Sequence, residues 1–160
     1  MYFCYHSPVG ELYLEMEGEA LTGIWFHDGR FSPAPDTFCR DVTPFLPVIH
    51  WLDCYFRGEC PEPPEIAMDI KGSAFQRAVW EQLRQIPYGH VTTYGAIAKV
   101  LEEKLGHKIA PQAVGGAVGR NPVSILVPCH RVVGAGGKLT GYGGGLWRKE
   151  YLLALETKST

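Results

Sequence analysis

Cys129 is the residue of this chain whose surroundings best suit chemistry. Pro128 precedes it, and His130 and Arg131 follow it directly. The thiolate is the reactive form of cysteine, and neighbouring cationic groups lower the pKa of a thiol from its ordinary value of about 8.5. The stretch therefore predicts a nucleophilic cysteine with a lowered pKa. The alternative is a small apolar residue buried in the core, which is the common role of an isolated cysteine.

The segment before Pro128 predicts how this cysteine is held. Residues 123–127 (VSILV) are mostly apolar, which is typical of a buried strand. Neighbouring side chains of a strand point to opposite faces, so His130 need not face the Cys129 sulfur, and a bridging water would link the two groups. We therefore expect Cys129 at the end of a strand.

Helical patterns precede that segment, over residues 73–86, 93–106 and 111–118. Ser73 and Gln76 have the types and spacing of a capping box at the start of the first helix. The other two are short and joined by a brief turn, which suggests a helix-turn-helix.

The last of these helices contains the adjacent glycines Gly115 and Gly116. Each glycine inside a helix costs about 1 kcal/mol relative to alanine, so a stable helix here implies a need for missing side chains. Close approach of DNA and tight packing inside the protein both meet that need.

The first half of the chain predicts a separate α/β unit. Residues 1–30 alternate between apolar and polar types, which predicts a small antiparallel sheet, and residues 44–56 have near-helical apolar spacing. Residues 58–65 are rich in proline and acids and predict a connection. We expect a supporting domain over residues 1–70 and a second domain over residues 71–160.

Charge divides the two halves more sharply than the net value of −2 suggests. Residues 1–70 hold three arginines, no lysine and twelve acidic residues, a balance of −9. Residues 71–160 hold twelve basic and five acidic residues, a balance of +7. Basic side chains release counterions when they meet phosphates, so the second half is a candidate surface for nucleic acid, or else a basic face that binds nothing.

The five cysteines are irregularly spaced and form no CxxC pair, so reduced thiols are expected rather than disulfides. Cys4, His6, His27 and Cys39 match no pattern of metal ligands along the chain, and no metal is predicted. The sequence has neither a run of 18 apolar residues nor the basic, apolar start of a signal peptide. A cytoplasmic protein without membrane contact is therefore expected.

Taken together, the motifs of the second half resemble the O6-alkylguanine-DNA alkyltransferases, also called methylated-DNA–protein-cysteine methyltransferases. The resemblance extends from Ser73 to Glu156, whereas residues 1–70 fit the variable first domain of the family only in outline. Its motifs are residues 86–89 (IPYG), 93–95 (TYG), 113–117 (AVGGA), 120–122 (RNP), 128–132 (PCHRV) and 141–146 (GYGGGL).

The resemblance implies a mixed α/β (α+β) fold, with a winged helix-turn-helix in the second domain. It implies repair of double-stranded DNA by irreversible, stoichiometric transfer of an alkyl group from O6-alkylguanine to Cys129. O4-alkylthymine is a second candidate substrate. The damaged base would be flipped out of the duplex. No cofactor is implied, and we expect a monomer without an obligate protein partner.

The resemblance also assigns residues to roles. Cys129, His130, Glu156 and Tyr94 would be catalytic, with Glu156 orienting His130 and Tyr94 donating to the guanine oxygen. The expected substrate contacts are Asn121, Arg131, Val132, Tyr142 and Gly143. The expected DNA contacts are Thr93, Gln112, Ala113, Val114, Gly115, Ala117 and Arg120.

Three features depart from the family pattern. Gln112 stands where the family usually has an arginine, Gly143 stands where a serine is common, and the turn over residues 102–110 is longer than in familiar members. Two other functions stay open at this point: a non-reacting protein that binds alkylated DNA, and a helix-turn-helix regulator that uses Cys129 as a sensor.

Overall fold

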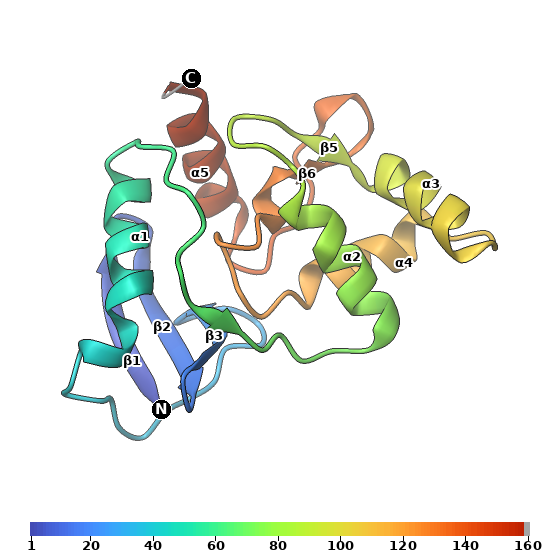
Figure 1. The fold of residues 1–160 in the computed structure, drawn as a ribbon. Coiled ribbons are helices and arrows are strands. Elements are labelled where there is room, and N and C mark those ends of the chain that lie inside the picture. The colour runs from blue at the N-terminus through green and yellow to red at the C-terminus, as the bar shows by residue number, and fades with distance from the viewer. Residues whose placement is uncertain (159–160) are drawn as a thin grey trace.

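The computed structural model describes residues 1–158. Its first part is a sheet in the order β1-β2-β3-β4, antiparallel for the first three strands and parallel between β3 and β4 (Figure 1). Helix α1 packs on it, since the Tyr5 hydroxyl donates to Asp53 at 2.6 Å and the Phe3 and Phe45 rings are 5.4 Å apart. The bounds are β1 Tyr2–Ser7, β2 Gly10–Glu17, β3 Ala20–Phe26, a 3-10 turn Thr43–Phe45, α1 Leu46–Phe56 and β4 Ala67–Met68.

Strand β2 shows why alternation predicted this sheet. Leu12, Leu14 and Met16 are buried, whereas Glu11 and Tyr13 lie on the opposite, partly exposed face. Successive side chains of a strand point to opposite faces, so one face enters the core and the other meets solvent. The predicted antiparallel sheet and the helix behind it are confirmed.

The second part is mainly helical. Helix α2 begins with the predicted capping box, in which Gln76 N donates to Ser73 Oγ at 3.1 Å and Ser73 N donates to Gln76 Oε1 at 3.0 Å. Helix α3 ends at the left-handed Gly106, which closes the helix without strain. The bounds are α2 Ala74–Arg84, β5 Thr92–Thr93, α3 Tyr94–Leu105, α4 Pro111–Gly119, β6 Val132–Val133 and α5 Leu146–Lys158.

Helices α3 and α4 form the predicted helix-turn-helix, but its turn is shorter than expected. Residues 102–105 continue α3, so the turn covers only residues 106–110. The Glu102 carboxylate accepts a hydrogen bond from Ile109 N at 3.0 Å, which ties the turn to the helix. The short strands β5 and β6 pair in parallel and join the start of α3 to the segment after Cys129.

The strand predicted over residues 123–127 is wrong. Val123 alone forms an isolated bridge, to Ile24 of β3, and Ile125 has a φ of 70°. The chain turns compactly here, and Val123, Ile125 and Val127 are all buried. A short apolar run indicates burial but does not distinguish a strand from a buried turn. Cys129 therefore lies in a 3-10 turn, Cys129–Arg131, rather than at a strand end.

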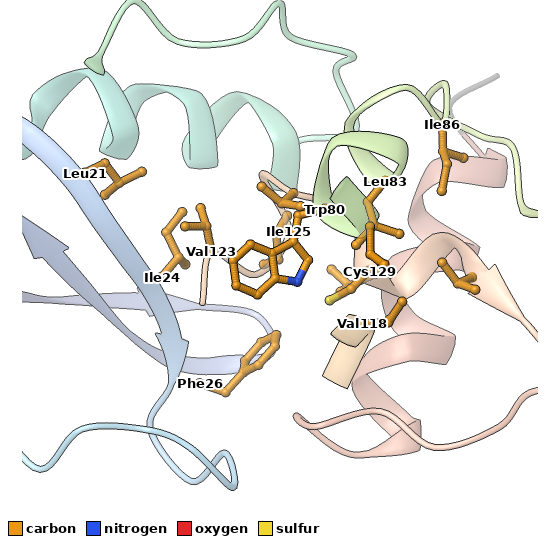
Figure 2. Close-up of a cluster of buried hydrophobic side chains, with 14 of the residues drawn as sticks. Leu21, Ile24, Phe26, Trp80, Leu83, Ile86, Val118, Val123, Ile125 and Cys129 are labelled. Atoms are coloured by element: carbon orange, nitrogen blue, oxygen red, sulfur yellow. The ribbon is translucent and has the colours of Figure 1, made fainter. Parts of the chain in front are cut away.

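Nearly all buried apolar side chains of residues 1–158 belong to one cluster that crosses from the sheet to the helices. Figure 2 places Trp80 of α2 in the middle of this cluster, with Ile24 and Phe26 of β3 on one side and Leu83 on the other. Trp80 Nε1 also donates to the carbonyl of Ala117 at 2.8 Å. The two parts thus share a core, and a domain boundary near residue 70 stays a prediction. Among the described residues, no helix combines the length and apolar character needed to cross a bilayer.

Candidate active site

A cavity of about 690 Å³ opens beside Cys129. Its walls come from both parts of the protein: the end of β3 with the loop after it, the start of α3, the exposed side of α4, and the glycine-rich segment before α5. The lining residues are Trp25, Phe26, Gly29, Arg30, Phe31, Ser32, Tyr94, Gly115, Gly116, Val118, Gly119, Arg120, Asn121, Ser124, Cys129, Gly141, Tyr142, Gly143 and Gly144.

Asn121 shapes the turn that carries Cys129. Its Nδ2 donates to the Val127 carbonyl at 2.8 Å, and its Oδ1 accepts from Val123 N at 3.0 Å. Cys129 N donates to the Val127 carbonyl at 2.8 Å. Asn121 thereby joins the end of α4 to the buried turn, and it fixes where the sulfur enters the cavity.

Behind Cys129, a buried carboxylate collects the donors of several elements. Glu156 of α5 lies 2.6 Å from His130 Nε2, accepts from Arg131 Nε at 2.7 Å, and accepts from the Tyr55 hydroxyl at 2.6 Å. Burial raises the pKa of Glu156, but hydrogen bonds and charges from His130 and Arg131 outweigh it and hold the pKa at about 2. Glu156 is therefore ionised at neutral pH.

His130 is the buried, neutral partner of Glu156. It is fully buried, and burial lowers its pKa in spite of the opposing effect of Glu156, so the resting imidazole is neutral. Because an ionised carboxylate only accepts hydrogen bonds, His130 Nε2 carries the proton that faces Glu156. His130 Nδ1 is then the acceptor, and it is buried with no hydrogen-bond partner among residues 1–158.

The pKa of the Cys129 thiol is shifted in the direction opposite to the one predicted from the sequence. Burial raises its pKa, and Asn121, Tyr142 and Lys149 oppose this only in part. The predicted lowering is wrong because the side chains of His130 and Arg131 turn toward Glu156. The resting sulfur is a protonated thiol, so its reaction needs a base.

Lys149 was not predicted from the sequence as a site residue. It lies seven residues before Glu156 and hence on the same face of α5. Its Nζ donates to the carbonyls of Val132 at 2.6 Å and Thr140 at 3.1 Å. Burial lowers its pKa. Lys149 therefore holds the strand after Cys129 and places a positive charge near the thiol.

Arg148 was also missed, and it connects the first part of the chain to the cavity wall. Its Nε donates to the Val9 carbonyl at 2.7 Å, and its Nη1 donates to Gly144 at 2.8 Å and pairs with Asp28. Its guanidinium lies 4.7 Å from the centre of the Phe26 ring. A side chain at Gly144 would collide with the same ring, since its Cβ would lie 2.5 Å from a Phe26 carbon.

Most of the residues expected to contact the substrate line the cavity, but two of them lie outside it. Tyr94, Asn121, Tyr142 and Gly143 line the cavity with Cys129; the Tyr94 hydroxyl lies 3.5 Å from Thr140 Oγ1. Arg131 lies outside the cavity lining and is bound to Glu156 and the Ile86 carbonyl. Val132 is buried, with its carbonyl bonded to Lys149.

On helix α4, the structure corrects two of the expected DNA contacts. Gln112, Ala113 and Arg120 are exposed, and Gly115 is partly so, but Val114 and Ala117 are buried in the core and cannot meet DNA with their side chains. Thr93 caps α3, with its Oγ1 accepting from Ala96 N at 3.1 Å.

The paired glycines of α4 are not explained by packing inside the protein. An added Cβ at Gly116 would meet no atom within 4 Å, and one at Gly115 would make only an ordinary 3.8 Å contact with the Tyr94 ring. The surface above these glycines is open to an external partner.

Residues 74–158 match the family model for the 6-O-methylguanine DNA methyltransferase, DNA binding domain. Over 152 residues, the chain is 46% identical to a methylated-DNA–protein-cysteine methyltransferase of Mycolicibacterium paratuberculosis, covering 95% of this chain and 89% of that protein. The chain belongs to this family. A second methylated-DNA–protein-cysteine methyltransferase, from Haemophilus influenzae, is 42% identical to this chain. The alignment covers 98% of this chain and 86% of that protein.

Solved structures agree with this membership. The Mycobacterium tuberculosis OGT in complex with DNA superposes with a TM-score of 0.85 at 40% identity, covering 99% of this chain and 94% of that chain. The O6-methylguanine DNA methyltransferase of Methanococcus jannaschii has a TM-score of 0.68 at 27% identity, over 97% of this chain and 93% of that one. The predicted fold class and family, with alkyl transfer as its class of activity, are confirmed.

Proposed function

We propose that this methyltransferase repairs O6-alkylguanine in double-stranded DNA by transferring the alkyl group to Cys129, once per molecule. The observation that carries this proposal is that the Cys129 thiol lies between a cavity and a buried histidine–carboxylate pair. On one side lies a cavity that opens past the exposed residues of α4, and on the other lies the buried His130–Glu156 pair. A cavity of about 690 Å³ is of a size suited to a flipped base.

The proposed chemistry starts with removal of the thiol proton. A water molecule passes it from Cys129 to His130 Nδ1, and the ionised Glu156 stabilises the resulting imidazolium. The sulfur then attacks the alkyl carbon in line with the bond to guanine O6, a C–S bond forms, and the C–O bond breaks. The electron pair stays on the guanine, and Tyr94 at the cavity wall supplies a hydrogen bond or a proton there.

DNA contact is proposed for the exposed side of α4. Gln112, Ala113 and Gly116 face outward, and the absence of a side chain at Gly116 lets a duplex approach the helix backbone. Arg120, at the end of α4, lies at both the surface and the cavity, where it can meet a phosphate next to the flipped base. We further propose that the protein acts as a monomer without an obligate protein partner, and the cytoplasm stays the predicted location.

The mass of the intact protein tests this function. After mixing with a duplex that carries one O6-methylguanine, the protein should become one methyl group heavier and the DNA should contain guanine. Cys129→Ser should stay unmodified while keeping its DNA affinity, because the sulfur supplies reactivity and little binding energy. A duplex with O4-methylthymine tests the second substrate. An unmodified parent protein would instead indicate a binding protein or a regulator, and repeated turnover with excess DNA would contradict the single use.

A further inference from the structure

The outer face of the first sheet brings together three side chains that the cavity does not use. Cys4 and His6 are two residues apart on β1 and therefore share a face, and Glu11 of β2 pairs with His6 in the strand register. Cys4 Sγ, a ring nitrogen of His6 and a carboxylate oxygen of Glu11 all lie within 4.8 Å of one another. His6 Nδ1 and Glu11 Oε1 are 3.6 Å apart.

We propose that Cys4, His6 and Glu11 bind a zinc-like divalent metal ion. Zinc takes thiolate, imidazole and carboxylate ligands at about 2.0–2.3 Å, and a tetrahedral arrangement places these ligand atoms roughly 3.3–3.8 Å apart. The His6–Glu11 separation already lies in that range, and the remaining atoms need to move by about 1 Å. His6 is free to move, since 79% of its side chain is exposed.

His27 supplies the fourth ligand. Its backbone N donates to the Glu11 carbonyl at 3.1 Å, which places it across from Glu11, directly after the end of β3 and on the same face of the sheet. Its ring Nδ1 lies 3.3 Å from that carbonyl, its Nε2 lies 4.0 Å from Asp28, and its ring meets the Tyr13 ring edge-on with the ring centres 6.5 Å apart. Binding of the ion by His27 requires a rotation of this side chain toward the other three groups.

The strand register explains why spacing along the chain did not predict this site. Four residues separate His6 from Glu11, and fifteen separate Glu11 from His27, yet hairpin pairing aligns them in one row. None of these four side chains lines the cavity at Cys129. The metal therefore has a structural role in the first sheet, and it takes no part in alkyl transfer.

Titration with Co²⁺ tests the proposal, because cobalt replaces zinc and its absorption reports a bound thiolate and a tetrahedral site. The full chain is used in the Cys129→Ser background, so that the reactive thiol cannot bind the ion. One Co²⁺ per chain should bind with a thiolate charge-transfer band, and Zn²⁺ should displace it. Cys4→Ser should abolish the band, and His6→Ala, Glu11→Gln and His27→Ala should each weaken affinity about tenfold or more.

The matched control is Cys60→Ser, which removes an exposed cysteine away from the cluster and should leave the band unchanged. The circular dichroism spectrum of each variant shows whether it has folded. The site is overturned if the folded parent shows no thiolate band, or if the band survives Cys4→Ser. Unchanged affinity in His27→Ala, with losses in the other three variants, assigns the fourth position to water and overturns the His27 ligand.

Discussion

Glu156 holds His130, Arg131 and Tyr55 at once, so its charge affects both reactivity and stability. Replacement by glutamine removes the charge that stabilises a protonated His130. We expect Glu156→Gln to slow alkyl transfer by about 10²-fold at neutral pH, with partial recovery at high pH, where hydroxide ionises the thiol without help. A pH–rate profile from single-turnover mixing measures this.

The control is Glu150→Gln, which neutralises an exposed carboxylate of the same helix. Its profile should match the parent. If the Glu156→Gln profile also keeps the parental shape, Glu156 does not act through the proton path, and its role is confined to holding Arg131 and Tyr55.

The same carboxylate predicts acid sensitivity. Its folded pKa of about 2 lies below the ordinary 4.5, so ionised Glu156 stabilises the fold above pH 4.5 and this stabilisation is lost as the pH falls toward 2. The loss is on the order of 3 kcal/mol. Urea unfolding at several pH values should show a decline in this window that is smaller in Glu156→Gln, where carboxylates such as Asp28, whose pKa is lowered by Arg148, still contribute. Equal pH dependence of the two proteins would contradict the assignment.

At the scale of elements, we expect a substitution at Gly116 of α4 to raise stability and to weaken DNA binding. Gly116→Ala should raise the free energy of unfolding by about 1 kcal/mol, because alanine favours the helix and its Cβ meets no atom within 4 Å. The same methyl group should weaken duplex binding if DNA approaches the backbone there. Thermal unfolding and fluorescence anisotropy measure the two effects, and a stabilised variant with unchanged affinity would remove Gly116 from the DNA surface.

Gln112 lies exposed in the first turn of α4, where the family usually has arginine. Arginine offers five donors and a charge to the orphaned base and the phosphates, whereas glutamine offers a short neutral amide. We expect Gln112→Arg to raise the repair rate on duplex DNA several-fold and to leave the rate with free O6-alkylguanine base unchanged. Equal effects on both substrates would place the change in the cavity or in folding instead.

Local sequence predicted the elements better than it predicted their contacts. The capping box at Ser73 and the cap at Thr93 act within a few residues, so the starts of α2 and α3 could be predicted. The buried turn over residues 123–127 could not, because it forms against a distant strand: Val123 bridges Ile24 of β3, and Ile125 has a positive φ. Tyr55 reaches Glu156 from 101 residues away, and no spacing rule indicates such a pair.

At the scale of the whole molecule, Arg148 connects the two parts at the wall of the active site. We expect Arg148→Gln to lower the free energy of unfolding by about 2–4 kcal/mol, since the carbonyls of Val9 and Gly144 lose their buried donor. Alkyl transfer should also slow, because the glycine wall is no longer held against Phe26. Arg84→Gln, which breaks an exposed pair within α2, is the control and should have little effect. Similar losses in the two variants would contradict this role.

The shared cavity wall also limits how this protein can be recombined. The family model covers residues 74–158, yet Trp25, Phe26 and the loop at residues 29–32 complete the chamber around the thiol. A chimera that joins the helical part to the first part of another family member keeps Cys129, but part of its cavity wall then comes from the other protein. We expect such a chimera to stay active only when the loop after β3 and the glycine-rich segment before α5 are exchanged together, and we expect these two stretches to vary together among relatives.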